Sequence, residues 1–118
     1  MTTSDRSKAF VESDSVAWQS AGEGIRRKIL GYDKTMMMVV VEFKKGSIAS
    51  VHRHMHTQVT FVEAGSFEVQ IGGEKRVLSR GDSFLALPNI DHGVIAHEDG
   101  CLVDVFSPMR EEFLDPKP

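Results

Sequence analysis

Apolar and polar residues alternate through most of the chain, which is typical of β-strands that bury one face. In "FEVQI", Phe67, Val69 and Ile71 fall on one face, whereas Glu68 and Gln70 fall on the other. No segment of helical length has the 3.6-residue period of an amphipathic helix. The pattern therefore predicts an all-β fold built mostly from antiparallel strands.

Turn-forming residues divide the apolar segments into consecutive hairpins. "TMMMVVVEFKKG" stops at Gly46, and "QVTFVEAGSFEVQIGGEKRVL" is interrupted at "AGS" and "GG". After the turn "RGD", Pro88 closes "SFLALP", and "HGVIAHEDGCLVDVFSP" reads as two strands about "EDG". Only "PMREEFL" predicts a short helix. Short strands at this spacing favour a sandwich or small barrel. We expect Met36 to Met38 to fill the strand interior, and Trp18 to lie in the core or at an interface.

Length and charge limit the domain count and the partners. A chain of 118 residues builds one hydrophobic core. We expect a single domain over residues 10–113, with a flexible N-terminal tail at 1–9 and a C-terminal tail at 114–118. The 14 basic and 17 acidic residues give a net charge of -3, which argues against a nucleic-acid partner.

The apolar runs and the cysteine content indicate a compartment. The longest unbroken apolar run, "MMMVVV", is too short to span a bilayer, and the N-terminal residues lack the apolar core of a signal peptide. Cys101 is the single cysteine, so no internal disulfide can form. We therefore expect a soluble, cytoplasmic protein without a membrane partner.

The stretch "HRHMHTQ", residues 52–58, holds three of the five histidines. Residues two apart in a strand point to the same face and are roughly 6.6 Å apart, so His52 and His54 can reach one metal ion. Gln58 would lie about 20 Å from His52 in an extended chain, so it joins them only if residues 55–57 turn. His56 either continues the face or lies in that turn, and both readings stay open.

A second element, "GDSFLALPNIDHGV", places His92 after a strand, a turn and a proline. Two histidines from one strand and a third from a later strand give the arrangement that holds a transition metal with open positions. Polar histidines on an exposed strand are the alternative. We expect one divalent transition metal. Nitrogen ligands suit zinc, nickel, iron and copper better than magnesium or calcium, and manganese also stays open.

These two elements carry a family resemblance. "GSIASVHRHMHTQVTFVEAG" keeps every spacing of the first cupin motif, although Gln58 stands where glutamate is commoner. "GDSFLALPNIDH" resembles the second cupin motif, with Asn89-Ile90-Asp91 in place of its usual glycine. The resemblance implies an RmlC-like cupin fold, an antiparallel double-stranded β-helix or jelly-roll barrel. It also implies the metal ligands His52, His54, Gln58 and His92.

The glutamine changes the charge of such a site. Three neutral imidazoles and a neutral amide leave the 2+ charge of a divalent ion uncompensated, whereas glutamate would cancel one unit. Such a site is a stronger Lewis acid and attracts anions. We expect a small anionic substrate bearing a carboxylate.

The segment "CLVDVFSPMREEFL" contains further chemistry. Asp104 stands in an otherwise apolar strand, where aspartate is disfavoured, and it shares a face with Phe106. The alternative is a charge on an edge strand paired with a nearby lysine or arginine. Together with "HRHMHTQ", this segment is similar to the small cupins of pectin and alginate breakdown, the KdgF type, which convert cyclic 4,5-unsaturated uronates into linear keto acids. That resemblance implies catalytic roles for Asp104, Phe106 and Arg110.

This resemblance gives a specific hypothesis. Linearisation removes a proton from the anomeric hydroxyl and delivers one to C4, without a redox step. In the hypothesis Asp104 moves the protons, Arg110 and the metal bind the carboxylate and ring oxygen, and Phe106 packs on the sugar ring. A cupin dioxygenase and a non-catalytic sugar- or metal-binding cupin are the alternatives.

Edge strands predict self-association. A small barrel of hairpins leaves edges exposed, and the segment Phe10–Ile29 is long enough to cover the edge of a partner subunit. Similar cupins are commonly homodimers, so we expect a homodimer.

Overall fold

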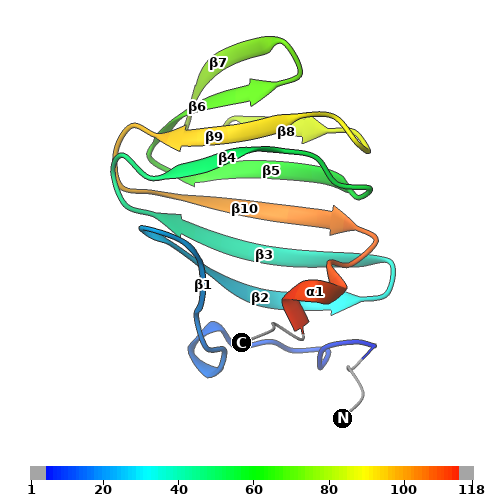
Figure 1. The fold of residues 1–118 in the computed structure, drawn as a ribbon. Helices are drawn as coiled ribbons and strands as arrows, with labels where there is room; N and C mark the ends of the chain where they lie inside the picture. The colour runs from blue at the N-terminus through cyan, green and yellow to red at the C-terminus, as the bar shows by residue number, and fades with distance from the viewer. Residues whose placement is uncertain (1–4, 115–118) are drawn as a thin grey trace.

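The computed structural model describes residues 5–114, which form two antiparallel sheets and very little helix (Figure 1). Residues 1–4 and 115–118, which belong to the expected tails, lie outside the described residues. A short helical turn, η1 (Ser13–Ser15), precedes the strands. In chain order the elements that follow are β1 (Gln19–Gly22), β2 (Ile25–Asp33), β3 (Met36–Phe43), β4 (Ile48–His52), β5 (Thr57–Ala64), β6 (Ser66–Ile71), β7 (Glu74–Ser79), β8 (Ser83–Ala86), β9 (His92–Ala96), β10 (Gly100–Ser107) and α1 (Glu111–Leu114).

The strand order shows how the chain winds between the sheets. The larger sheet has the order β1-β2-β3-β10-β5-β8, and the smaller sheet has the order β4-β9-β6-β7. Strands far apart in sequence are therefore neighbours, as β3 and β10 are, and all pairings are antiparallel. This arrangement is a double-stranded β-helix of the jelly-roll kind. The expected all-β fold class is confirmed, and the short helix predicted in "PMREEFL" is α1.

Side chains on the inner faces of the two sheets form the core. In β3, Met37 and Val39 are fully buried, whereas Met36 and Met38 are 52% and 41% exposed. The expectation that all three methionines fill the interior is therefore wrong for two of them, because alternate residues of a strand point to opposite faces.

Apolar side chains also line up on the outer face of the larger sheet. The pairing register places Met38, Val105, Val59 and Leu85 side by side across β3, β10, β5 and β8. Met38, Val59 and Leu85 are each about half exposed, at 41%, 46% and 50%. Phe61, two residues along β5, is 45% exposed. These residues form a contiguous exposed apolar patch, a feature that is typical of interaction surfaces.

The N-terminal segment folds against the chain's own sheet. Gln19–Gly22 pairs with β2 as its edge strand. Lys28 is buried on the outer side of β2, where its Nζ donates hydrogen bonds to the Ser13 carbonyl oxygen (2.8 Å) and hydroxyl (3.2 Å). Trp18 lies under two cations, with Arg26 Cζ 4.0 Å and Lys28 Nζ 4.7 Å from the ring centre. Much of the segment expected to cover a partner therefore covers its own sheet.

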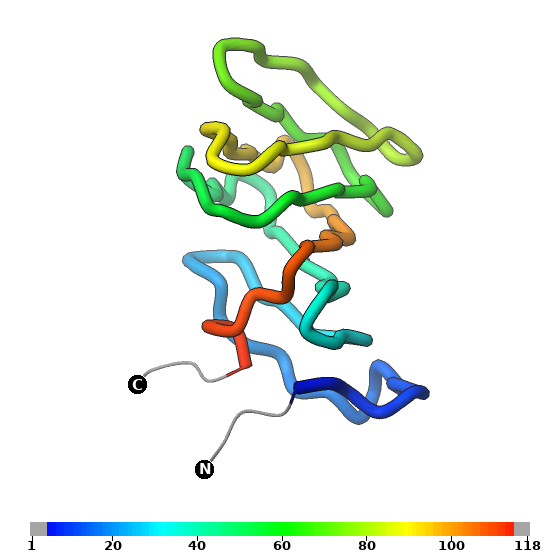
Figure 2. Tube along the Cα trace, turned by 90° about the vertical axis from the view of Figure 1, so that its right-hand side faces the viewer, coloured from blue at the N-terminus to red at the C-terminus, as the bar shows by residue number. Residues whose placement is uncertain are grey.

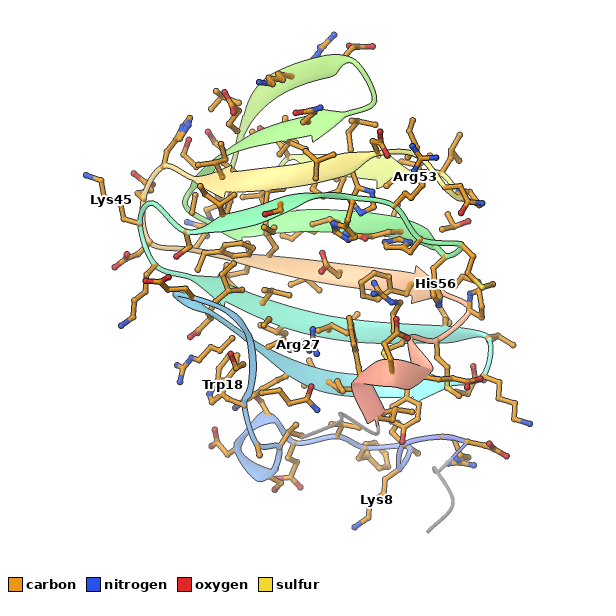
Figure 3. The ribbon with its side chains drawn as sticks, in the orientation of Figure 1. Lys8, Trp18, Arg27, Lys45, Arg53 and His56 are labelled. Atoms are coloured by element: carbon orange, nitrogen blue, oxygen red, sulfur yellow. The ribbon has the colours of Figure 1, made fainter. Side chains whose placement is uncertain are left out.

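The views along and across the sheets show which end of the strands carries each loop. The β6–β7 hairpin lies at one extreme of the molecule and the N-terminal segment lies at the other (Figures 1 and 2). Lys45 lies at one end of the strands, and Arg53 and His56 lie at the opposite end (Figure 3). The histidine-rich loop is therefore gathered at one mouth of the barrel.

Two glycines with the same backbone geometry give a test of this packing. Gly65 and Gly46 have φ of 90° and 86°, but a Cβ on Gly65 would lie 2.7 Å from Gly100 Cα, whereas one on Gly46 would meet nothing within 4 Å. Both Gly→Ala changes incur left-handed strain of about 1–2 kcal/mol. We expect Gly65→Ala to lose about 3 kcal/mol or more in urea unfolding, because backbone must also move. Equal losses in the two variants would contradict the close approach of Gly65 to Gly100.

Candidate metal centre and active site

The β4–β9 pairing brings two of the predicted ligands together. His52 ends β4, His92 begins β9, and the two are direct partners in the register. Their ring centroids are 4.6 Å apart. His54 lies in the loop after β4, and its ring is 4.7 Å from that of His92. One nitrogen from each imidazole lies within 4.8 Å of the others. The strand expected to continue through His54 stops two residues earlier, so a loop rather than strand alternation directs this ring.

Gln58 reaches the same centre because the chain reverses direction. The backbone bends at residues 55 and 56 and re-enters the sheet as β5. The Oε1 atom of Gln58 then lies 3.0 Å from His54 Nε2. The turn on which the participation of Gln58 depends is therefore present.

Backbone carbonyls fix the orientation of all three imidazoles. A carbonyl oxygen only accepts hydrogen bonds, so the ring nitrogen that contacts it must carry the proton. Each histidine uses Nδ1 for such a bond, which leaves the Nε2 lone pair free to bind a metal. The Nδ1–O distances are 2.9 Å from His52 to Ser50, 3.0 Å from His54 to His56 and 2.9 Å from His92 to Ile90.

The atoms left available to bind a metal, imidazole Nε2 and the amide oxygen of Gln58, are arranged to suit a divalent ion. His92 Nε2 is buried and has no hydrogen-bond partner among the described residues. The amide nitrogen of Gln58 donates to Thr60 Oγ1 (2.9 Å) and Asp104 Oδ1 (3.3 Å), so its oxygen faces the lone pair of His54. Two acceptors at 3.0 Å repel unless a cation lies between them. Two ligand atoms that each lie ~2.1 Å from one metal ion, with a ligand–metal–ligand angle of about 90°, are also ~3.0 Å apart.

The electrostatics favour the metal-binding form of the histidines. Burial is the largest effect on His92 and on His54, and it lowers the pKa of both, while the contact with Gln58 opposes it at His54. The neutral imidazole is therefore the stable form near neutral pH. That form binds a metal without first releasing a proton.

Asp104 is joined to this centre by hydrogen bonds. Thr60 Oγ1 donates to Asp104 Oδ1 at 2.6 Å, and the Gln58 amide donates to the same oxygen. Burial raises the pKa of Asp104 to about 6, against the opposing effects of Thr60, Arg110 and Gln58. A carboxyl group in this range can accept or donate a proton near neutral pH. The edge-strand alternative is wrong, because β10 lies between β3 and β5 inside the larger sheet.

Phe106 and Arg110 lie beside the histidines. Phe106 is buried, and its ring makes edge contacts with His54 (centroids 5.8 Å apart) and Phe113 (5.8 Å). Arg110 Cζ lies 5.0 Å from the Phe106 ring centre and 4.4 Å from that of Phe113. The Arg110 Nε donates to Glu112 Oε2 at 2.9 Å. A guanidinium group is thus held over two aromatic rings.

One cavity of about 290 Å³ collects most of these groups. Its wall is apolar toward β3 and polar toward the histidines. This volume suits a small molecule. The predicted residues that line it are His52, Gln58, His92, Asp104, Phe106 and Arg110. His54 does not line it but contacts the rings of His52 and His92.

Several residues of the site were not predicted from the sequence. Thr60 is two residues from Gln58 on the same strand face, which is the signal that could have found it. Arg27 stands in the run "IRRKIL" and carries no such signal, yet it lines the cavity. His56, for which the sequence leaves two readings open, lies in the turn before β5, where it is buried against His54 and its Nδ1 has no hydrogen-bond partner among the described residues.

The loop that lacks the usual glycine keeps a glycine-like backbone. Asn89 has φ of 63°, a left-handed conformation that asparagine tolerates better than most residues. Its N–H donates to the His54 carbonyl oxygen at 2.7 Å, and Arg53 pairs with Asp91 at 2.9 Å. These contacts tie the two ligand-bearing loops together.

Comparison with known proteins identifies the family. The cupin domain model matches residues 39–106, more than half of the chain. The chain belongs to the cupin family. This cupin is 48% identical to the pectin degradation protein KdgF of Dickeya dadantii (strain 3937) over 109 residues, which cover 91% of this chain and 99% of that protein. The resemblance to KdgF-type cupins is therefore confirmed.

Solved structures agree with this assignment. An RmlC-like cupin from Shewanella frigidimarina NCIMB 400 superposes with a TM-score of 0.90 at 38% identity, covering 93% of this chain and 99% of that one. KdgF from Halomonas sp. superposes with a TM-score of 0.87 at 39% identity, covering 92% and 100%. Within residues 5–114, this cupin has no helix long and apolar enough to cross a membrane.

Metal binding can be tested with a matched pair of histidines. His92→Ala removes a buried Nε2 from the cluster, whereas His97→Ala changes an exposed histidine outside it. We expect the first change to weaken binding of zinc or nickel by more than about a hundredfold and the second to leave it unaltered. Calorimetric titration of metal-stripped protein measures both. Unchanged affinity in His92→Ala would contradict the site.

Proposed function

We propose that this cupin acts in pectin degradation by linearising cyclic 4,5-unsaturated uronates. The observation that carries the proposal is the cavity in which a metal-binding set, the carboxyl group of Asp104 and the guanidinium group of Arg110 meet. The 48% identity to a protein named for pectin degradation supports the pathway.

The proposed reaction is an isomerisation. The anomeric hydroxyl loses its proton, C1 becomes an aldehyde, and the bond between C1 and the ring oxygen breaks. The released enol oxygen at C5 becomes a ketone when C4 receives a proton. One proton is removed and one is added, so no oxidant or reductant is needed.

The side chains in the cavity match these requirements. Asp104, held by Thr60 and Gln58, transfers protons between the anomeric oxygen and C4. Arg110 orients the substrate carboxylate, because its planar guanidinium group can bind both oxygens. Phe106 excludes water from one side of the sugar ring. A divalent ion bound by His52, His54, Gln58 and His92 supplies Lewis acidity that stabilises developing negative charge on oxygen.

The amide of Gln58 serves two neighbours at once. Its oxygen faces the metal-binding cluster, and its nitrogen donates to Asp104 and Thr60. A glutamate here would have no N–H to donate and would place a second carboxylate beside Asp104. Glutamine therefore keeps the Asp104 carboxyl group hydrogen bonded without placing a second negative charge beside it.

Removal of the proposed acid–base group is the direct test. We expect Asp104→Asn to lower kcat on unsaturated galacturonate by about 10²–10⁴-fold, because the amide cannot transfer protons. Asp14→Asn, which changes an exposed carboxylate in the η1 turn, serves as the control. The conjugated double bond absorbs ultraviolet light, so its loss reports turnover. Uncatalysed rates in the wild type would refute the reaction, and oxygen consumption at an electrode would favour a dioxygenase.

We also propose a homodimer through the outer face of the larger sheet. An uncharged apolar band runs across β3, β5 and β8 and consists of Met38, Val59, Phe61 and Leu85. A second copy offers the same apolar surface, so a two-fold axis would cover both. Phe61→Lys should give a monomer by light scattering, whereas Val77→Lys on the outer face of the smaller sheet should not. Unaltered mass in Phe61→Lys would contradict this interface.

A further inference from the structure

Arg27 is a second guanidinium group in the same cavity. It lies on β2 and pairs with buried Val41 in the register, so its side chain is on the inner face. It lines the cavity and lies beside α1 (Figure 3). Its Nε donates to Gln19 Oε1 at 3.1 Å, and its Cζ lies 3.7 Å from the ring centre of Phe113. The group is thus held in place from two sides.

Arg27 and Arg110 share one aromatic ring. Arg110 Cζ is 4.4 Å from the ring centre of Phe113, so the two guanidinium carbons lie within twice that distance of each other. Burial lowers the pKa of Arg27, and the charge of Arg110 lowers it further. Two like charges are therefore brought together where water is partly excluded.

Carboxylates of the chain offset the charge of this pair only in part, because the charge of Glu112 raises the pKa of Arg27 by less than burial and Arg110 lower it. Among residues 5–114, no carboxylate lies within ion-pair distance of Arg27. Glu112 pairs instead with Nε of Arg110, at 2.9 Å, and its side chain is 56% exposed. Bringing a charge into a cavity without a partner is costly. An anionic ligand would remove that cost, and the terminal N–H groups of Arg27 make no hydrogen bond within residues 5–114.

We propose that Arg27 and Arg110 together form a clamp for the carboxylate of a sugar acid. Arg110 alone supplies one fork, and Arg27 supplies a second from β2. Two forks can engage both oxygens of one carboxylate and fix its plane. The identity of the anion as a uronate rests on the proposed function. The clamp itself rests on the position and charge of the two arginines.

Binding of a ligand that cannot react separates the clamp from catalysis. Galacturonate lacks the double bond, and its methyl ester lacks the charge. We expect Arg27→Gln to weaken galacturonate binding by about 10–100-fold in calorimetry, as for loss of charged hydrogen bonds, and to leave the ester unaffected. Arg27→Lys should be intermediate, because it keeps the charge without the fork. On unsaturated galacturonate, KM should rise by a similar factor while kcat changes less than about threefold.

A neighbouring arginine provides the control. Arg26 is on the outer face, bonded to Glu42 at 2.9 Å, so Arg26→Gln should bind both ligands like the wild type. Equal affinity for galacturonate in wild type and Arg27→Gln would overturn the clamp, as would equal losses for acid and ester. If Arg27→Gln fails to fold, Arg27→Lys provides the test. The clamp is then overturned if Arg27→Lys has the same ratio of affinities for galacturonate and its methyl ester as the wild type. A wild type that binds galacturonate through Arg27 but does not consume the unsaturated sugar supports the clamp and contradicts the proposed reaction.

Discussion

Hydrogen bonds from three imidazole Nδ1 atoms to backbone carbonyls are the constraint on which the site depends. They fix the tautomer and the direction of each ring, so three lone pairs converge without a charged ligand. Pairing of β4 with β9 provides two of these rings, and the loop between β4 and β5 provides the third. The sheet pairing is therefore as much a part of the metal site as the histidines themselves.

Uncharged hydrogen-bond donors next to the metal-binding cluster hold the carboxyl group of Asp104. Gln58 and Thr60 both donate to Asp104, so the carboxyl group is oriented by groups that add no charge to the cavity. Asp104 lines the cavity together with Arg27 and Arg110, and Glu112 pairs with Arg110 from beyond the lining. The negative charge of an acidic substrate would offset the remaining positive charge of the two arginines.

Local features of the site could be predicted from the sequence, whereas contacts between distant segments could not. The alternation in "FEVQI" and the spacing of "HRHMHTQ" are encoded within a few residues, and each indicated a strand or a ligand set. The outward positions of Met36 and Met38 cannot be predicted, because the sequence alone does not say which strand face meets the core. The role of Arg27 cannot be predicted from the sequence, because Arg27 is 83 positions from Arg110 and the contact that the two share is the ring of Phe113.

One strand, β10, separates two surfaces of different character. Its even-numbered residues Leu102, Asp104 and Phe106 line the cavity, while Val103 and Val105 lie on the apolar outer face. Because neighbouring positions from Leu102 to Phe106 face opposite sides of the sheet, substitutions can change the chemistry of the cavity and the apolar character of the outer face independently. An insertion of a single residue in this strand would exchange the two, which makes its length far less tolerant of change than its composition.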